Sequence, residues 1–66
     1  MFTVSAYNHS RQLCYEETYL DFDYAHQTFI TATKCVDCGC AIITSAITGE
    51  IVMEYSYSKK TITDYR

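Results

Sequence analysis

The chain has 66 residues, a net charge of −3, 48% hydrophobic residues and no proline. This balance is typical of a folded globular domain, because disordered chains combine lower hydrophobicity with more unbalanced charge. The length allows one domain over residues 1–66, and its uninterrupted apolar runs are far too short to cross a membrane. No signal peptide is visible, so we expect a cytoplasmic protein whose thiols are reduced.

The first twenty residues predict a β-hairpin. Residues 2–7 alternate apolar and polar side chains, as a half-buried strand does. Asn8, His9 and Ser10 follow, and such side chains favour turns because they bond to nearby backbone groups. Residues 13–20 then return to β-favouring side chains, which predicts the second strand.

Residues 21–39 carry a helical pattern. Apolar side chains three and four positions apart form one stripe, which consists of Phe22, Ala25, Phe29, Ala32 and Val36. Asp21 or Asp23 is predicted to cap the start of this helix, and Gly39 to provide a left-handed cap after its end. A competing interpretation makes residues 28–34 a strand, since its threonines weaken helix propensity.

The β pattern returns from Cys40 onward. Residues 51–58 place Ile51, Met53, Tyr55 and Tyr57 at alternate positions, which predicts a one-sided strand, and Thr48-Gly49 marks the turn before it. The register stays open: a two-residue loop places Ile42, Thr44 and Ala46 on the face of Met53, and a three-residue loop with a bulge places Ala41, Ile43 and Ser45 there. Residues 59–66 predict either a short fifth strand or a frayed tail.

These elements predict a small α+β domain of order β-β-α-β-β, an antiparallel sheet with one helix packed on one face. Either register leaves some of the apolar residues Ile42, Ile43, Ile47 and Val52 on the uncovered face. A chain near this size buries only about 60% of the surface that its unfolded form exposes. We therefore expect a homodimer that hides the uncovered face, with Ile43 and Val52 in the interface.

The only segment typical of metal chemistry is Cys35-Val36-Asp37-Cys38-Gly39-Cys40. A zinc-binding mini-domain would use Cys35, Cys38 and Cys40, with Cys14, His26 or His9 as the fourth ligand. Because a second ligand pair is missing, the preferred interpretation is four buried, reduced thiols and no cofactor. Redox catalysis is disfavoured, because the C-terminal end of a helix raises a thiol pKa.

Charge is uneven along the chain. Residues 12–33 contain no Lys or Arg but four carboxylates, interleaved with tyrosines. Tyrosine offers large contact area at low entropic cost, and carboxylates steer basic partners. The predicted protein-binding residues are therefore Tyr15, Glu16, Glu17, Tyr19 and Asp21, beside Ile43 and Val52 for self-association. The alternative is a solvated hairpin whose tyrosines are half-buried against the sheet.

Other function classes find little support. With two glycines there is no phosphate-binding loop, and no nucleophile stands beside a base, so we expect no enzyme. The net charge opposes nucleic acid, because the one basic cluster is Lys59, Lys60 and Arg66. The sequence predicts a non-catalytic protein-binding module that acts as an inhibitor or an adaptor of a larger protein with a basic surface. Small accessory proteins of phages and mobile elements often have this size.

Overall fold

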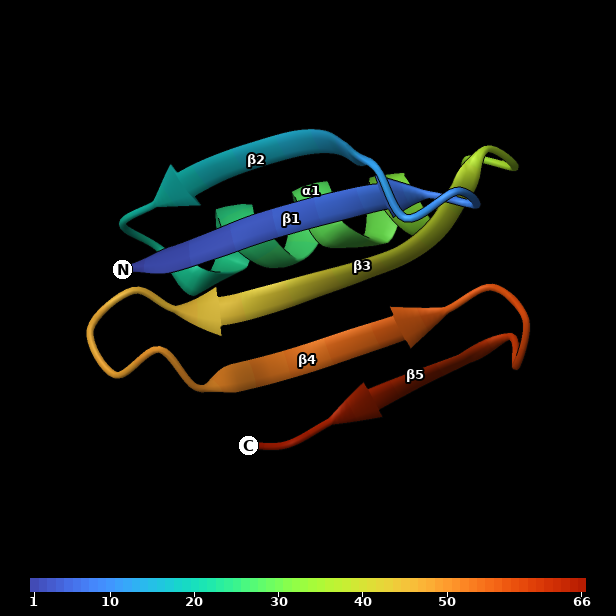
Figure 1. Ribbon diagram of the computed structural model, residues 1–66. Coiled ribbons are helices and arrows are strands. Elements are labelled where there is room, and N and C mark those ends of the chain that lie inside the picture. The colour runs from blue at the N-terminus through green and yellow to red at the C-terminus, as the bar shows by residue number, and fades with distance from the viewer.

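The computed structural model describes residues 1–66 as a five-stranded antiparallel sheet, in the order β2-β1-β3-β4-β5, with one helix packed against it (Figure 1). The elements are β1 (Phe2–Asn8), β2 (Leu13–Tyr19), α1 (Phe22–Thr33), β3 (Cys38–Ser45), β4 (Ile51–Ser56) and β5 (Thr61–Asp64). The predicted α+β fold is confirmed. The tail forms the fifth strand, because residues 61–64 pair with β4.

Helix α1 has 12 residues and is neither long nor apolar enough to cross a membrane. Asp21 caps its start, since the carboxylate accepts a hydrogen bond of 3.0 Å from the backbone N–H of Asp23. The helix runs through to Thr33, so the competing strand interpretation of residues 28–34 is wrong. Ala25 and Phe29 on the predicted stripe are fully buried. The predicted length is also wrong: the helix ends at Thr33, and Val36 is 73% exposed.

The sequence predicted that Gly39 caps the end of the helix, and this prediction is wrong. Lys34 is the cap, and Gly39 belongs to β3. Its lack of a side chain serves the sheet. A Cβ atom at this position would lie 2.7 Å from the carbonyl oxygen of Asn8 on β1. The two strands approach closely here, because their pairing is shifted by an irregularity between Tyr7 and Asn8.

The second hairpin adopts the side-chain arrangement of the three-residue alternative, although its loop is longer. Ala41 is paired with Tyr55 and Ile43 with Met53 on the helix-covered face. Gly49 has a φ of 79° in the connecting turn, a conformation that glycine adopts without steric penalty.

The hydrophobic core lies between α1 and the middle of the sheet. It consists of Val4, Ala6, Ala25, Phe29, Cys38, Ala41, Ile43, Met53 and Tyr55. Ile43 has no exposed surface, so its predicted place on the uncovered face is wrong. Alternation along β3 puts Ile42, its neighbour, on that face instead.

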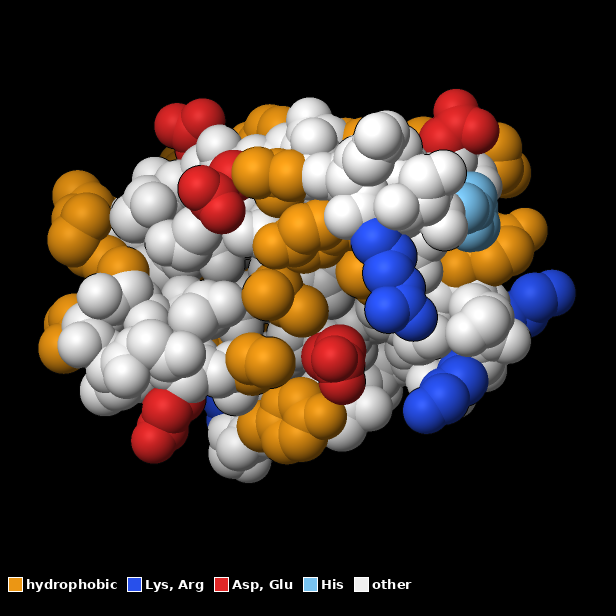
Figure 2. All heavy atoms as spheres, viewed as in Figure 1, with side chains coloured by type: hydrophobic (Ala, Val, Ile, Leu, Met, Phe, Trp, Pro, Cys, Tyr) orange, Lys and Arg blue, Asp and Glu red, His pale blue; other side chains and the backbone are white.

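The uncovered face is mainly polar. One row of side chains crosses all five strands, formed by Glu16, Ser5, Ile42, Glu54 and Thr63. A second row contains Thr18, Thr3 and Thr44. Figure 2, seen with the helix behind the sheet, shows hydrophobic side chains as a broken band between polar and charged ones. This face therefore carries hydroxyls and carboxylates on both sides of an apolar band, to which Ile42 and Val52 contribute (Figure 2).

Candidate functional site

Strand β2 is a free edge of the sheet. It pairs with β1 on one side only, and six of its seven residues are exposed. Alternate backbone N–H and C=O groups of an edge strand point away from the sheet and have no strand partner. The pairing with β1 is regular from Tyr15 to Tyr19, so this run keeps the straight geometry that another strand needs.

The predicted binding residues divide between the two sides of the sheet. Tyr15, Glu17 and Tyr19 alternate onto the helix side of β2, in register with Ala6, Val4 and Phe2. Glu16 lies on the other side, where its carboxylate accepts a hydrogen bond of 3.1 Å from the hydroxyl of Ser5.

The remaining predicted residues lie elsewhere. Asp21 follows β2 directly and caps α1. Val52 is half-buried on β4 and, as the neighbour of the buried Met53, lies on the uncovered face. Ile43 lies beneath the helix. The structure thus brings the acidic and tyrosine residues together at one edge and separates them from both apolar residues.

A hydrogen-bonded chain ties this edge to the helix. The hydroxyl of Thr28 on α1 donates to the hydroxyl of Tyr19 over 3.1 Å, and the hydroxyls of Tyr19 and Tyr15 are bonded to each other. The bond to Tyr19 raises the pKa of Tyr15 to about 12, with smaller contributions from desolvation and nearby charge. The phenol of Tyr15 therefore stays neutral and fixed at the edge.

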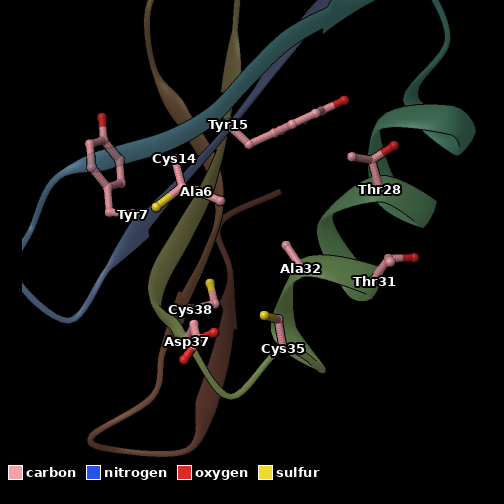
Figure 3. A pocket seen from close by; sticks show the side chains of 10 residues that line it. All are labelled: Ala6, Tyr7, Cys14, Tyr15, Thr28, Thr31, Ala32, Cys35, Asp37 and Cys38. Atoms are coloured by element: carbon pink, nitrogen blue, oxygen red, sulfur yellow. The ribbon is translucent and has the colours of Figure 1, made fainter.

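An apolar groove of about 370 Å³ lies between this edge and the C-terminal half of the helix (Figure 3). It exists because α1 packs mainly on β1 and β3 and leaves β2 largely uncovered. Its walls come from β1, β2, α1, the segment after the helix and the start of β3: Ala6, Tyr7, Cys14, Tyr15, Thr28, Thr31, Ala32, Cys35, Asp37 and Cys38. We call this space the groove.

Sequence reasoning missed the groove. Cys14 lines it from a β-bulge: Ala6 pairs with Tyr15 and Tyr7 with Leu13, which leaves Cys14 without a partner. Neither this bulge nor the early end of the helix follows from hydrophobic spacing.

The four cysteines are free thiols. Only Cys38 is buried, so the prediction of four buried thiols is wrong for the exposed Cys14 and Cys35. Burial raises the pKa of the Cys38 thiol, and this thiol donates to the carbonyl oxygen of Cys40 over 3.3 Å. Cys35 and Cys38 close a turn, in which the N–H of Cys38 donates to the carbonyl of Cys35 over 3.1 Å.

No three His, Cys, Asp or Glu side chains form a group that could hold a metal ion. Cys35 and Cys38 line the groove, whereas Cys40 lines a separate polar hollow. The ring of His26 stacks on Phe22, with 5.7 Å between the ring centroids. Zinc binding therefore stays a prediction, without a ligand set gathered in the folded chain.

The polar hollow lies where the β1–β2 turn meets the end of β4. One ring nitrogen of His9 is 2.8 Å from the carbonyl oxygen of Val36, and the ring packs edge-on against Tyr57. These contacts fasten the β1–β2 turn to its neighbours.

No family model, curated protein or solved structure matches the chain. Its function is therefore inferred from β2 and the groove.

Proposed function

We propose that the chain is a non-catalytic protein-binding module that receives a basic segment of a larger protein along β2. The observation that supports this most directly is a free strand edge surrounded by negative charge. Glu16 and Glu17 lie on β2, Asp21 and Asp23 follow it, and residues 12–33 contain no Lys or Arg. Binding without chemistry would make the chain an inhibitor or an adaptor of its partner.

Charge at this edge acts mainly on the approach of the partner. Carboxylates gathered at one site raise the association rate of a basic protein, and salt weakens this attraction. Individual exposed ion pairs add little to affinity. The free backbone groups of β2 and the exposed ring of Tyr15 supply the contacts that hold the partner after it arrives.

A second copy of the chain fits this edge poorly. Two β2 strands paired edge to edge would bring the Glu16 and Glu17 side chains of both copies together, and like charges opposite each other destabilise a sheet. Stacking two uncovered faces meets a related obstacle, because Glu16 and Glu54 lie in the central row and would lose water. The predicted homodimer therefore stays a prediction.

A peptide-display selection on the immobilised chain tests the proposal without a known partner. We expect the selected sequences to be rich in Lys and Arg and to lose binding to Glu17→Lys. The matched control is Glu50→Lys, which makes the same charge change at an exposed residue outside β2. Neutral or acidic selected sequences, or equal binding to both variants, would contradict the proposal.

A further inference from the structure

We infer that the partner segment binds as a sixth strand beside β2 and inserts one apolar side chain into the groove. This inference rests on the proposed function and adds the conformation and the residue pattern of the partner. Three observations carry it: the regular free edge from Tyr15 to Tyr19, the groove next to that edge, and the alternation of side chains along β2.

Alternation fixes which partner side chains reach the groove. Neighbouring strands place paired residues on the same face of a sheet. The partner residue paired with Tyr15 therefore points to the helix side, where the groove opens. The residue paired with Glu17 points to the same side, and the residue paired with Glu16 points to the other. The partner pattern is one apolar residue followed or preceded by two basic residues.

The chemistry of the groove favours an apolar side chain. The hydroxyls of its helix wall are already engaged: Thr28 donates to Tyr19, and Thr31 donates to the carbonyl oxygen of Gln27 over 2.9 Å. Two of its thiols are engaged as well, since Cys14 and Cys38 each face a backbone carbonyl. The groove therefore offers contact area but few free hydrogen-bonding groups, and its volume suits one aromatic or branched aliphatic side chain.

The opposite edge of the sheet does not offer the same site. Strand β5 has only four residues, and Lys59 and Lys60 precede it, with a charge that repels a basic segment. Its carboxylate, Asp64, is already paired with Arg66 over 2.9 Å. A basic strand therefore prefers β2 over β5.

The test uses a short fluorescent peptide of threonines and lysines around a central Lys-Lys-Phe-Lys-Lys, which offers the pattern to β2 in both strand directions, with binding followed by anisotropy. We expect replacement of its Phe by Ala to weaken binding by about tenfold or more, because the groove loses its occupant. Two further peptides carry N-methyl groups on complementary sets of alternate amides. Only the set that faces β2 should abolish binding, since the other set points to solvent.

Two protein variants test the groove itself. Thr31→Trp fills it from an exposed helix position, and Gln27→Trp adds the same side chain one turn earlier, at an exposed residue outside the groove lining. Circular dichroism is used to check that both variants fold. We expect Thr31→Trp to remove the advantage of the Phe peptide over the Ala peptide, and Gln27→Trp to preserve it.

The outcomes separate the two proposals. Binding that falls with Glu17→Lys but ignores the Phe and the N-methyl groups would overturn this inference and leave the proposed function standing. Loss with one N-methyl set but no effect of Phe would overturn the groove insertion. A Phe peptide that does not bind at all, or tolerance of both N-methyl sets, would overturn the sixth strand. Equal binding to the native chain and Glu17→Lys would contradict the proposed function too.

Discussion

At the scale of single residues, a glycine can have several structural roles, and the sequence pattern around Gly39 does not show which one applies. Gly39 follows a Cys-x-x-Cys pair and a helical stripe, so a helix cap or a metal knuckle is the natural expectation. The structure gives a different reason, because the backbone of Asn8 occupies the space of a side chain. Spacing along the chain does not reveal such a contact, since the two residues are distant in sequence.

Replacement of Gly39 by Ala is expected to destabilise the fold by about 1–3 kcal/mol, because β1 and β3 must move apart to admit the methyl group. The neighbouring change Cys40→Ala removes atoms at the same strand end and is the control. Urea unfolding followed by circular dichroism measures both. Equal stability of Gly39→Ala and the native chain would show that the strands separate without penalty.

Phe29 and Val36 belonged to one predicted stripe, but their environments are opposite. Phe29 has no exposed surface, whereas Val36 is 73% exposed beyond the end of the helix. Phe29→Ala should therefore lower the free energy of unfolding by about 3–5 kcal/mol, which a domain of this size barely survives. Val36→Ala should change it by less than about 0.5 kcal/mol. Similar losses in thermal or urea unfolding would contradict the observed helix end.

At the scale of elements, the periodicity of the sequence predicted those helices and strands that bury one face. Period-two alternation identified β1 and β4, and three-four spacing identified the helix, because each follows from a face that must be buried. Strand β2, which is mostly exposed, was identified by its β-favouring residue types. The helix end was wrong, since Val36 continues the spacing by chance after Thr33 ends the helix. The strand order and the bulge at Cys14 depend on pairing between distant segments, which no local pattern encodes.

The hydrogen-bonded tyrosines that connect β2 to α1 make the stability of the fold depend on pH. The pKa of Tyr15 is raised from the usual 10.0 to about 12 by its bond to Tyr19. The folded chain therefore favours the neutral phenol, so this contribution to stability is complete below pH 10 and is lost as the pH rises toward 12. The contribution is small, because the ring is partly exposed.

Ultraviolet or NMR titration measures this ionisation directly. We expect Tyr15 to ionise near pH 12 in the native chain and closer to 10 in Tyr19→Phe, which removes the bonded hydroxyl. Tyr24→Phe is the control, since it alters an exposed helix tyrosine outside the hydrogen-bonded chain. A Tyr15 titration that does not respond to Tyr19→Phe would show that the two hydroxyls are not bonded in solution.

At the scale of the whole molecule, the sheet is wider than the helix that covers it. The core forms over β1, β3 and β4. Helix α1 lies behind β1 and touches β2 at few positions, and the groove lies between β2 and the helix (Figure 1, Figure 3). The sequence predicted the acidic and tyrosine character of this edge, because composition alone reveals it. It did not predict the groove, which depends on which strand lies at the edge and where the helix ends.

The central claim is that a basic, extended segment joins the sheet at β2. Intermolecular NOE contacts between the Lys-Lys-Phe-Lys-Lys peptide and the isotope-labelled chain test it most directly. We predict backbone contacts with residues 15–19, in the cross-strand pattern of a β-ladder, and contacts from the Phe ring to Ala32 and Cys14. Backbone contacts with β5, or contacts only with the uncovered face around Ile42, would contradict it.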